Sequence, residues 1–129
     1  MPIHYADITN YLDAIANNAN GDVGSAPHQY WWHVNADINQ PPLPYDDFVS
    51  GEVFGIGVPI IDKSNPLSSV FYVLLTTPAG AEGYPQMPKG GPFITDSGFS
   101  VQLPDGTTVT GSEIQANMAE WLGSGYPEN

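Results

Sequence analysis

Glycine and proline set the strongest limit on how this chain folds, because 14 glycines and 13 prolines occur among its 129 residues. Proline removes a backbone donor, and glycine is the costliest residue to order, so neither supports long regular elements. We therefore expect many turns and long loops. Fifteen aromatic side chains and a hydrophobic content of 41% favour ordered loops over disorder. The length provides one domain, residues 1–129, with one modest core.

The charge balance excludes several classes of partner. Fourteen acidic residues stand against two basic ones, which gives a formal net charge of -12. Nucleic-acid phosphates require lysine and arginine, and anionic lipid surfaces repel an acidic protein. No stretch approaches the ~20 consecutive apolar residues that span a bilayer. The sequence therefore predicts no nucleic-acid partner and no membrane span.

The chain contains no cysteine. Disulfides, thiolate zinc sites, iron–sulfur clusters, cysteine nucleophiles and thioether-linked haem are all excluded by that absence.

Apolar residues at three- and four-residue spacing predict helices in four places. The first covers residues 7–19 with Asp7 as its N-cap, and a short second helix covers residues 45–50. The third begins at Asn65-Pro66 and ends at Thr77-Pro78, and the last covers residues 112–122 with Ser112 as its cap. Residues 99–110 alternate around Pro104-Asp105-Gly106 and predict a small β-hairpin. The expected fold is mostly α, with long Gly/Pro loops.

Four segments carry a resemblance to a known family. They are YADI at residues 5–8 leading into YLDA at 11–14, DKSNPLSSVFY at 62–72, MPKGGP at 87–92, and residues 112–127 from the last helix to Gly125-Tyr126-Pro127. In this order they resemble a class I cytochrome c domain of the bacterial secreted type. The resemblance implies a cytochrome c-like helical fold in which the hairpin is an insertion. It also implies a periplasmic or extracellular location, and it places Met87 at the family's axial-ligand position.

The haem-attachment motif C-x-x-C-H of that family is absent. Ala16, Ala19 and Asn20 stand where its two cysteines and its histidine are aligned. Thioether attachment needs both sulfurs, and the proximal ligand is the imidazole, so haem cannot be attached covalently and no cofactor is expected. Natural loss and deliberate removal of the motif from an electron-transfer protein are both consistent with this sequence.

Four consecutive side chains, Tyr30, Trp31, Trp32 and His33, are the candidate ligand-binding residues. A domain without haem must refill or collapse the haem cavity, because empty cavities are costly. On an extended segment Trp31 and Trp32 would point in opposite directions. We therefore expect one indole in the core and one exposed, where it could stack on a sugar.

Histidines offer a second set of candidates. His28 and His33 flank the aromatic residues and, with His4 or an aspartate, could bind a divalent metal. The simpler interpretation is that they are surface or hydrogen-bonded residues. Non-covalent haem between Met87 and either His28 or His33 is a further alternative.

No catalytic motif is present: the chain lacks G-x-S-x-G, H-E-x-x-H, a P-loop and G-x-G-x-x-G. The adjacent Asp46 and Asp47 do not form the opposed carboxylate pair of a glycosidase. We therefore predict a non-enzymatic, haem-free binding or interaction module whose ligand is a polysaccharide or a protein. The alternatives are electron transfer and a metal site or hydrolase built on His28, His33 and nearby carboxylates.

Overall fold

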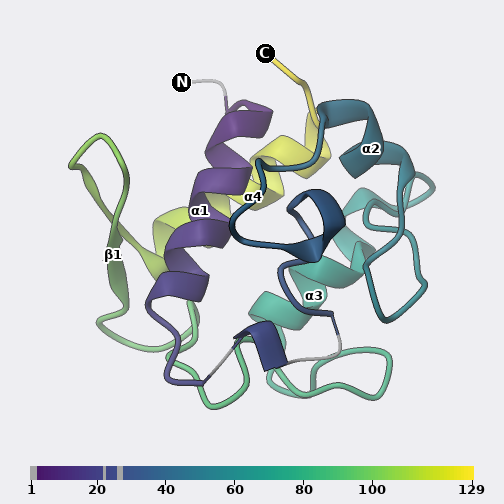
Figure 1. Ribbon diagram of the computed structural model, residues 1–129. Helices are drawn as coiled ribbons and strands as arrows, with labels where there is room; N and C mark the ends of the chain where they lie inside the picture. Colours follow the sequence, from purple (N-terminus) through teal and green to yellow (C-terminus); the bar gives the residue numbers. More distant parts are fainter. Residues whose placement is uncertain (1–2, 22, 26–27) are drawn as a thin grey trace.

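Two 13-residue helices, α1 (Tyr5–Asn17) and α4 (Gly111–Gly123), are the longest elements of the chain. The computed structural model describes residues 3–21, 23–25 and 28–129. Within them lie two shorter helices, α2 (Tyr45–Ser50) and α3 (Val70–Thr76), and a hairpin of β1 (Ser100–Gln102) and β2 (Thr108–Thr110) (Figure 1). Three 3-10 turns complete the order: η1 (Val23–Ser25), η2 (Val34–Ala36) and η3 (Pro66–Ser68).

The expectation of a mostly α domain is wrong. The structure is 38% helical when the 3-10 turns are included, and a two-stranded antiparallel sheet and long loops account for much of the remainder, so the domain is mixed. The physical reason is the distribution of glycine and proline. Pro44 and Gly51 flank α2, and Pro78 follows α3 closely, so these helices reach only six and seven residues.

The observed N-caps of α1 and α4 lie three and two residues before the expected ones. His4 is the N-cap of α1, and its backbone N–H donates to Asp7 Oδ2 at 2.8 Å, so Asp7 lies inside the first turn. Thr110 rather than Ser112 caps α4. The Glu113 N–H donates to Thr110 Oγ1 at 3.2 Å, and the Thr110 N–H donates to Glu113 Oε1 at 3.0 Å. This reciprocal pair is a capping box, which satisfies two otherwise unpaired donors.

The helix expected after Asn65 is divided in two. Ser69 lies between η3 and α3 with φ -54° and ψ 131°, outside the helical region. It is fully buried, and its hydroxyl accepts a hydrogen bond from the Asp62 N–H at 2.9 Å. A serine that bonds to nearby backbone competes with helix formation, which explains the break.

The hairpin occurs where alternation predicted it. Val101 pairs with Val109 at the centre of the two strands. Strand β2 runs directly into α4, and Gly111 at that junction lies against the Ile94 carbonyl, where an added Cβ would approach the oxygen to 2.0 Å. Only glycine fits this contact.

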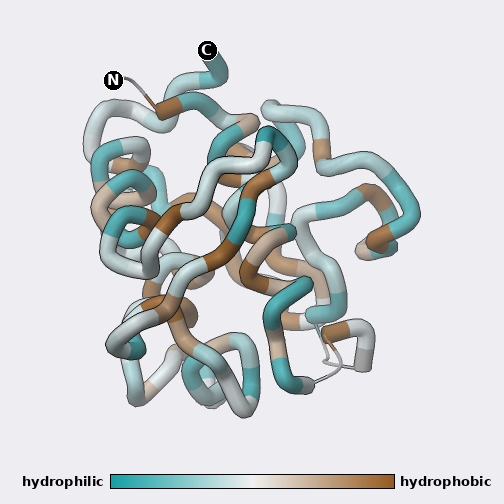
Figure 2. The backbone as a smooth tube through the Cα atoms, turned by 90° about the vertical axis from the view of Figure 1, so that its left-hand side faces the viewer, coloured by the Kyte–Doolittle hydropathy of each residue, from teal (hydrophilic) through white to brown (hydrophobic). Residues whose placement is uncertain are grey.

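The core lies between α1, α4 and the segments packed on them. Asn117 of α4 donates from Nδ2 to the Tyr11 hydroxyl of α1 at 2.8 Å, which links the two helices. Figure 2 shows most of the hydrophobic backbone stretches toward the middle of the molecule and many hydrophilic ones on outer loops. No helix in the described part of the chain is long and apolar enough to cross a membrane.

Candidate functional site

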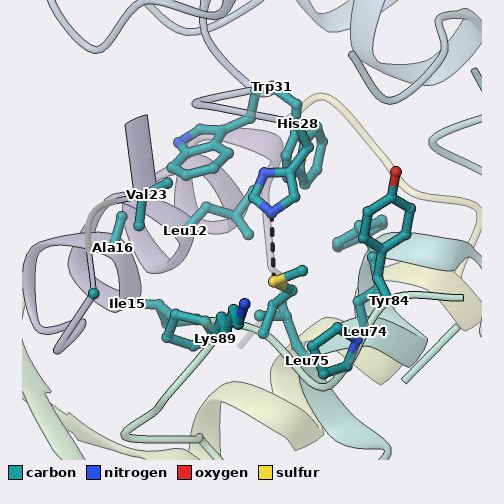
Figure 3. A pocket seen from close by; sticks show the side chains of 16 residues that line it. Leu12, Ile15, Ala16, Val23, His28, Trp31, Leu74, Leu75, Tyr84 and Lys89 are labelled. Carbon is teal, nitrogen blue, oxygen red and sulfur yellow. Dashed lines mark hydrogen bonds between the residues drawn. The ribbon is translucent and has the colours of Figure 1, made fainter. Parts of the chain in front are cut away.

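A cavity of about 420 Å³ opens beside α1 and α3 (Figure 3). Apolar side chains make up most of its wall: Leu12, Ile15 and Ala16 from α1; Phe71, Leu74 and Leu75 from α3; and Val23, Trp31, Trp32, Pro85, Met87 and Pro88 from loops. His28, Tyr84 and Lys89 add polar groups, and Gly21 completes the wall. A volume of about 300–1,000 Å³ with few polar groups is typical of small-molecule sites.

His28 and Met87 meet within this cavity. His28 is only 6% exposed, and its Nε2 lies 3.4 Å from Met87 Sδ (Figure 3). Its other ring nitrogen, Nδ1, lies 2.7 Å from the Gln29 carbonyl oxygen. Met87 is fixed to α3 through its backbone N–H, which donates to the Leu74 carbonyl at 2.7 Å. Two segments far apart in sequence therefore place one imidazole against one thioether.

The environment of His28 favours its neutral form. Burial lowers the pKa of His28, because a charged imidazolium loses hydration there, and the hydrogen bond to Gln29 acts in the opposite, weaker direction. A carbonyl oxygen only accepts, so in the neutral ring the hydrogen resides on Nδ1. The Nε2 lone pair therefore points toward the sulfur.

The expectation that one indole would be exposed is wrong. Trp31 is 8% and Trp32 is 4% exposed, and His33 is 5% exposed, whereas Tyr30 is partly exposed. These residues form a turn, closed by the His33 N–H donating to the Tyr30 carbonyl at 2.9 Å, rather than an extended strand. Because a turn does not alternate its side chains between two faces, both indoles face inward. Both line the cavity.

His33 does not share a site with His28. Its Nε2 lies 2.6 Å from Asp13 Oδ1, and its Nδ1 lies 2.7 Å from the Gln40 carbonyl. The Trp32 indole N–H also donates to Asp13 Oδ1 at 2.7 Å. Both histidines are buried and hydrogen-bonded, but the structure does not bring them together. Across residues 3–21, 23–25 and 28–129, no three His, Cys, Asp or Glu side chains are grouped to bind a metal.

Ala16, Ala19 and Asn20, which the resemblance aligns with a haem-attachment motif, lie in the last turn of α1 and just after it. Ala16 is part of the cavity wall, and Ala19 donates its N–H to the Ala16 carbonyl at 3.2 Å. Asn20 donates from its backbone N–H to the Gly91 carbonyl at 2.8 Å and from Nδ2 to the Gly90 carbonyl at 3.2 Å. Asn20 therefore connects the end of α1 to the loop that follows Met87.

Asp46 and Asp47 lie in the first turn of α2, where carboxylates stabilise the positive end of a helix. This position gives the acidic pair a structural explanation.

Sequence reasoning missed the part of the wall formed by Leu74, Leu75, Tyr84 and Lys89. The apolar face of the third predicted helix gave a signal for the two leucines, but it did not distinguish a cavity wall from a packed core. Tyr84 and Lys89 lie in a Gly/Pro loop with no periodic pattern.

Comparisons with known proteins leave the chain without an assigned relative, because no family model, curated protein or solved structure matches it.

Proposed function

We propose that this protein is a non-catalytic binding module that takes a compact, mainly apolar small molecule into the cavity beside α1 and α3. The observation that supports this proposal is the cavity itself, with its volume of about 420 Å³ and its mostly aliphatic and aromatic wall. The apolar wall of an open cavity faces water, and a ligand that covers it is stabilised by the removal of that surface from water.

The polar groups of the wall indicate the kind of molecule. Lys89 contributes to the wall and is exposed, so its ammonium is available at the opening. It is one of only two basic residues in a chain of net charge -12. A ligand with an apolar body and one anionic end fits this arrangement, because the body enters the cavity and the anion stays near Lys89.

The fluorescent dye 1-anilinonaphthalene-8-sulfonate matches that description and tests the proposal. We expect saturable binding, with enhanced emission, to the native protein. Ala16→Phe places a ring in the cavity and should abolish binding. The matched control is Ala6→Phe, the same substitution on an exposed position of α1, which should bind the dye normally. Equal binding by both variants, or no saturable binding to the native protein, would overturn the proposal.

Non-covalent haem, with a role in electron transfer, is a second candidate because His28 and Met87 are the donor types of an axial ligand pair. The donor types fit, but the spacing does not. Two ligands on opposite sides of a metal, with bonds of about 2.1 Å and 2.3 Å, would separate Nε2 from Sδ by about 4.4 Å, against the 3.4 Å found here. Haem binding therefore requires the two side chains to move apart by about 1 Å.

Hemin added to the purified protein separates the two candidates. A Soret band that survives gel filtration and disappears in Met87→Leu would support haem binding through this pair. Dye binding without a retained Soret band would support the small-molecule module alone.

Several sequence-based expectations stay predictions. They are the relationship to cytochrome c domains, a periplasmic or extracellular location, and a polysaccharide or protein as the ligand. For a polysaccharide, the burial of Trp31 and Trp32 leaves Tyr30 as the partly exposed ring of the aromatic segment.

A further inference from the structure

The dipeptide Asn20-Gly21, just after the end of α1, is the one place in the chain where asparagine precedes glycine. Asparagine is chemically labile because the next backbone nitrogen can attack its side-chain amide. Glycine has no Cβ, so it shields that nitrogen less than any other residue does. The sequence marks this dipeptide, and the structure shows whether the nitrogen is available.

The backbone nitrogen of Gly21 is available for this attack. Among residues 3–21, 23–25 and 28–129, no atom accepts a hydrogen bond from the Gly21 N–H. Asn20 and Gly21 are both exposed, so water and solvent base reach them. The Asn20 side chain donates from Nδ2 to the Gly90 carbonyl at 3.2 Å, which is at the long end of the range for such bonds and holds the amide weakly.

The other asparagines are protected by the residues that follow them. Wherever an asparagine other than Asn20 precedes a described residue, the next nitrogen donates a hydrogen bond to a carbonyl or belongs to a proline. The nitrogens after Asn10 and Asn117 donate within α1 and α4, those after Asn17, Asn18, Asn35 and Asn39 donate to the carbonyls of Ala14, Ala16, His33 and Asp37 at 2.9–3.2 Å, and Asn65 precedes Pro66. Asn20 is therefore distinguished by its surroundings as well as by its glycine.

Asp105-Gly106, in the loop of the hairpin, offers a comparison, because an aspartate before glycine cyclises by the same attack. Here the Gly106 N–H donates to the Leu103 carbonyl at 2.9 Å. Asp105 Oδ1 accepts hydrogen bonds from the Thr107 N–H at 2.9 Å and from the Thr107 hydroxyl at 2.6 Å. Both reacting groups are engaged, so the fold should preserve this aspartate.

We propose that Asn20 is a site of spontaneous deamidation in the native protein. The Gly21 nitrogen loses its hydrogen to solvent base and forms a bond to the Asn20 side-chain carbon Cγ. The bond from Cγ to Nδ2 breaks, and Nδ2 leaves as ammonia with hydrogen taken from water. Water then opens the cyclic imide at either of its carbonyls, which leaves an aspartate or an isoaspartate at position 20. In sum, an amide and water become a carboxylate and ammonium, without an oxidant or a reductant.

The modification changes the mouth of the cavity beside Lys89. Gly21 is part of the cavity wall, and a Cβ added to it would lie 3.2 Å from the Lys89 carbonyl oxygen. A carboxylate at position 20 has no hydrogen to donate to the Gly90 carbonyl, and it brings a negative charge to the side of the cavity where Lys89 lies. Deamidation therefore weakens the binding of a ligand with an anionic end. This consequence rests on the proposed function, whereas the modification itself does not.

Peptide mapping by mass spectrometry tests the modification on the native protein, incubated at neutral pH and physiological temperature for several weeks. We expect aspartate and isoaspartate at position 20, formed about tenfold or more faster than at Asn18, because the Ala19 N–H must first lose its hydrogen bond. Asp105 should stay unchanged in the native protein and isomerise in guanidinium chloride, where its hydrogen bonds are lost. An Asn20 that keeps its amide in the native protein, over a time in which the unfolded chain converts it, would overturn the proposal.

Binding of 1-anilinonaphthalene-8-sulfonate tests the consequence with two variants of the same residue. Asn20→Asp carries the charge of the product, and Asn20→Gln keeps an amide. We expect Asn20→Asp to bind the dye roughly two- to fivefold more weakly than Asn20→Gln, the effect of one exposed charge on another. Asn39→Asp adds the same charge at an exposed residue outside the cavity wall and should bind the dye as the native protein does. Equal binding by the two Asn20 variants would overturn the effect on the cavity. A native protein that converts Asn20 but binds no dye would overturn the small-molecule proposal and leave the modification supported.

Discussion

The aromatic cluster of Tyr5, Phe48 and Trp121 is closely packed, whereas the cavity in the same small domain is not. In the cluster, the Tyr5 ring lies 5.1 Å from the Phe48 centroid and 6.4 Å from that of Trp121, and Phe48 and Trp121 are 6.0 Å apart. Phe48 and Trp121 are completely buried. The cavity, in contrast, leaves about 420 Å³ between equally apolar residues.

This difference separates a close-packed region from an open one within the same domain. Edge-to-face and offset aromatic pairs contribute beyond their buried area, so the cluster can stabilise a domain that leaves other apolar surface uncovered. Trp31 belongs to both regions: it packs 5.6 Å from Phe48 and 5.7 Å from Phe71, and it also lines the cavity. Variants of each region can test this division.

Removing the largest ring of the cluster should have the largest effect. Trp121 is fully buried, and its indole N–H donates to the Pro127 carbonyl at 2.8 Å. Trp121→Ala should lower the free energy of unfolding by about 3–5 kcal/mol, which is a large part of a small domain's stability. Urea denaturation followed by circular dichroism measures it. Leu67→Ala, at a residue that is 49% exposed, is the control and should change stability by less than about 0.5 kcal/mol. Similar losses in the two variants would contradict the role of the cluster.

Filling the cavity should act in the opposite direction. Ala16→Phe should raise the free energy of unfolding by about 0.5–2 kcal/mol, because the new ring gains contacts that the wall now lacks. Thermal denaturation of Ala16→Phe and of the control Ala6→Phe, each compared with the native protein, measures the difference. A clear destabilisation by Ala16→Phe alone would mean that the wall is already close-packed.

The Tyr5 hydroxyl links the cluster to a loop and makes stability sensitive to alkaline pH. It donates to the Leu43 carbonyl, and Tyr5→Phe should cost about 1 kcal/mol at pH 7. Burial, together with the negative charge of Asp47, raises the pKa of Tyr5 well above its ordinary value. The unfolded chain then ionises first, near pH 10, so this contribution is intact below pH ~10 and is lost as pH rises further toward the folded pKa. Between pH ~9 and ~11 the free energy of unfolding of Tyr5→Phe should therefore fall less than that of the native protein. Urea denaturation at a series of pH values measures this. If the two proteins lost stability in parallel, the raised pKa of Tyr5 would not be the cause.

The smallest effect is expected at the rim of the cavity. Asn20→Ala removes the Nδ2 hydrogen bond to the Gly90 carbonyl but keeps the backbone bond to Gly91. The side chain is exposed, so we expect a loss of about 0.5 kcal/mol, with faster amide exchange around residues 88–91. Unchanged exchange there would show that Asn20 does not restrain the loop.

The sequence predicted the presence of the helices and the hairpin better than the residues at which they begin. Helix 45–50 and the hairpin were predicted from local signals that the structure contains, whereas α1 and α4 start two and one residues earlier than expected. Thr110 and Ser112 are both residue types that cap helices, and they lie two positions apart. The sequence does not show where the hairpin ends, so it gives no reason to prefer Thr110. The split at Ser69 depended on its bond to Asp62, which no periodic pattern reveals.

The site was predicted only in parts. His28 and Met87 were both singled out as candidates, but their meeting depends on a contact between residues 59 positions apart. The inward position of both indoles depended on a turn at residues 30–33 that the run of aromatic letters does not show. Long-range packing, rather than residue type, decides such features.

The junction between β2 and α4 bears on how this domain can vary in length. The capping box at Thr110 and the contact of Gly111 with Ile94 specify both residues there, so an added residue would displace the whole of α4. At the other end of the hairpin, residues 104–106 are exposed, and a longer loop costs little closure entropy. Insertions, grafted epitopes and new recognition loops are therefore best tolerated at the hairpin tip.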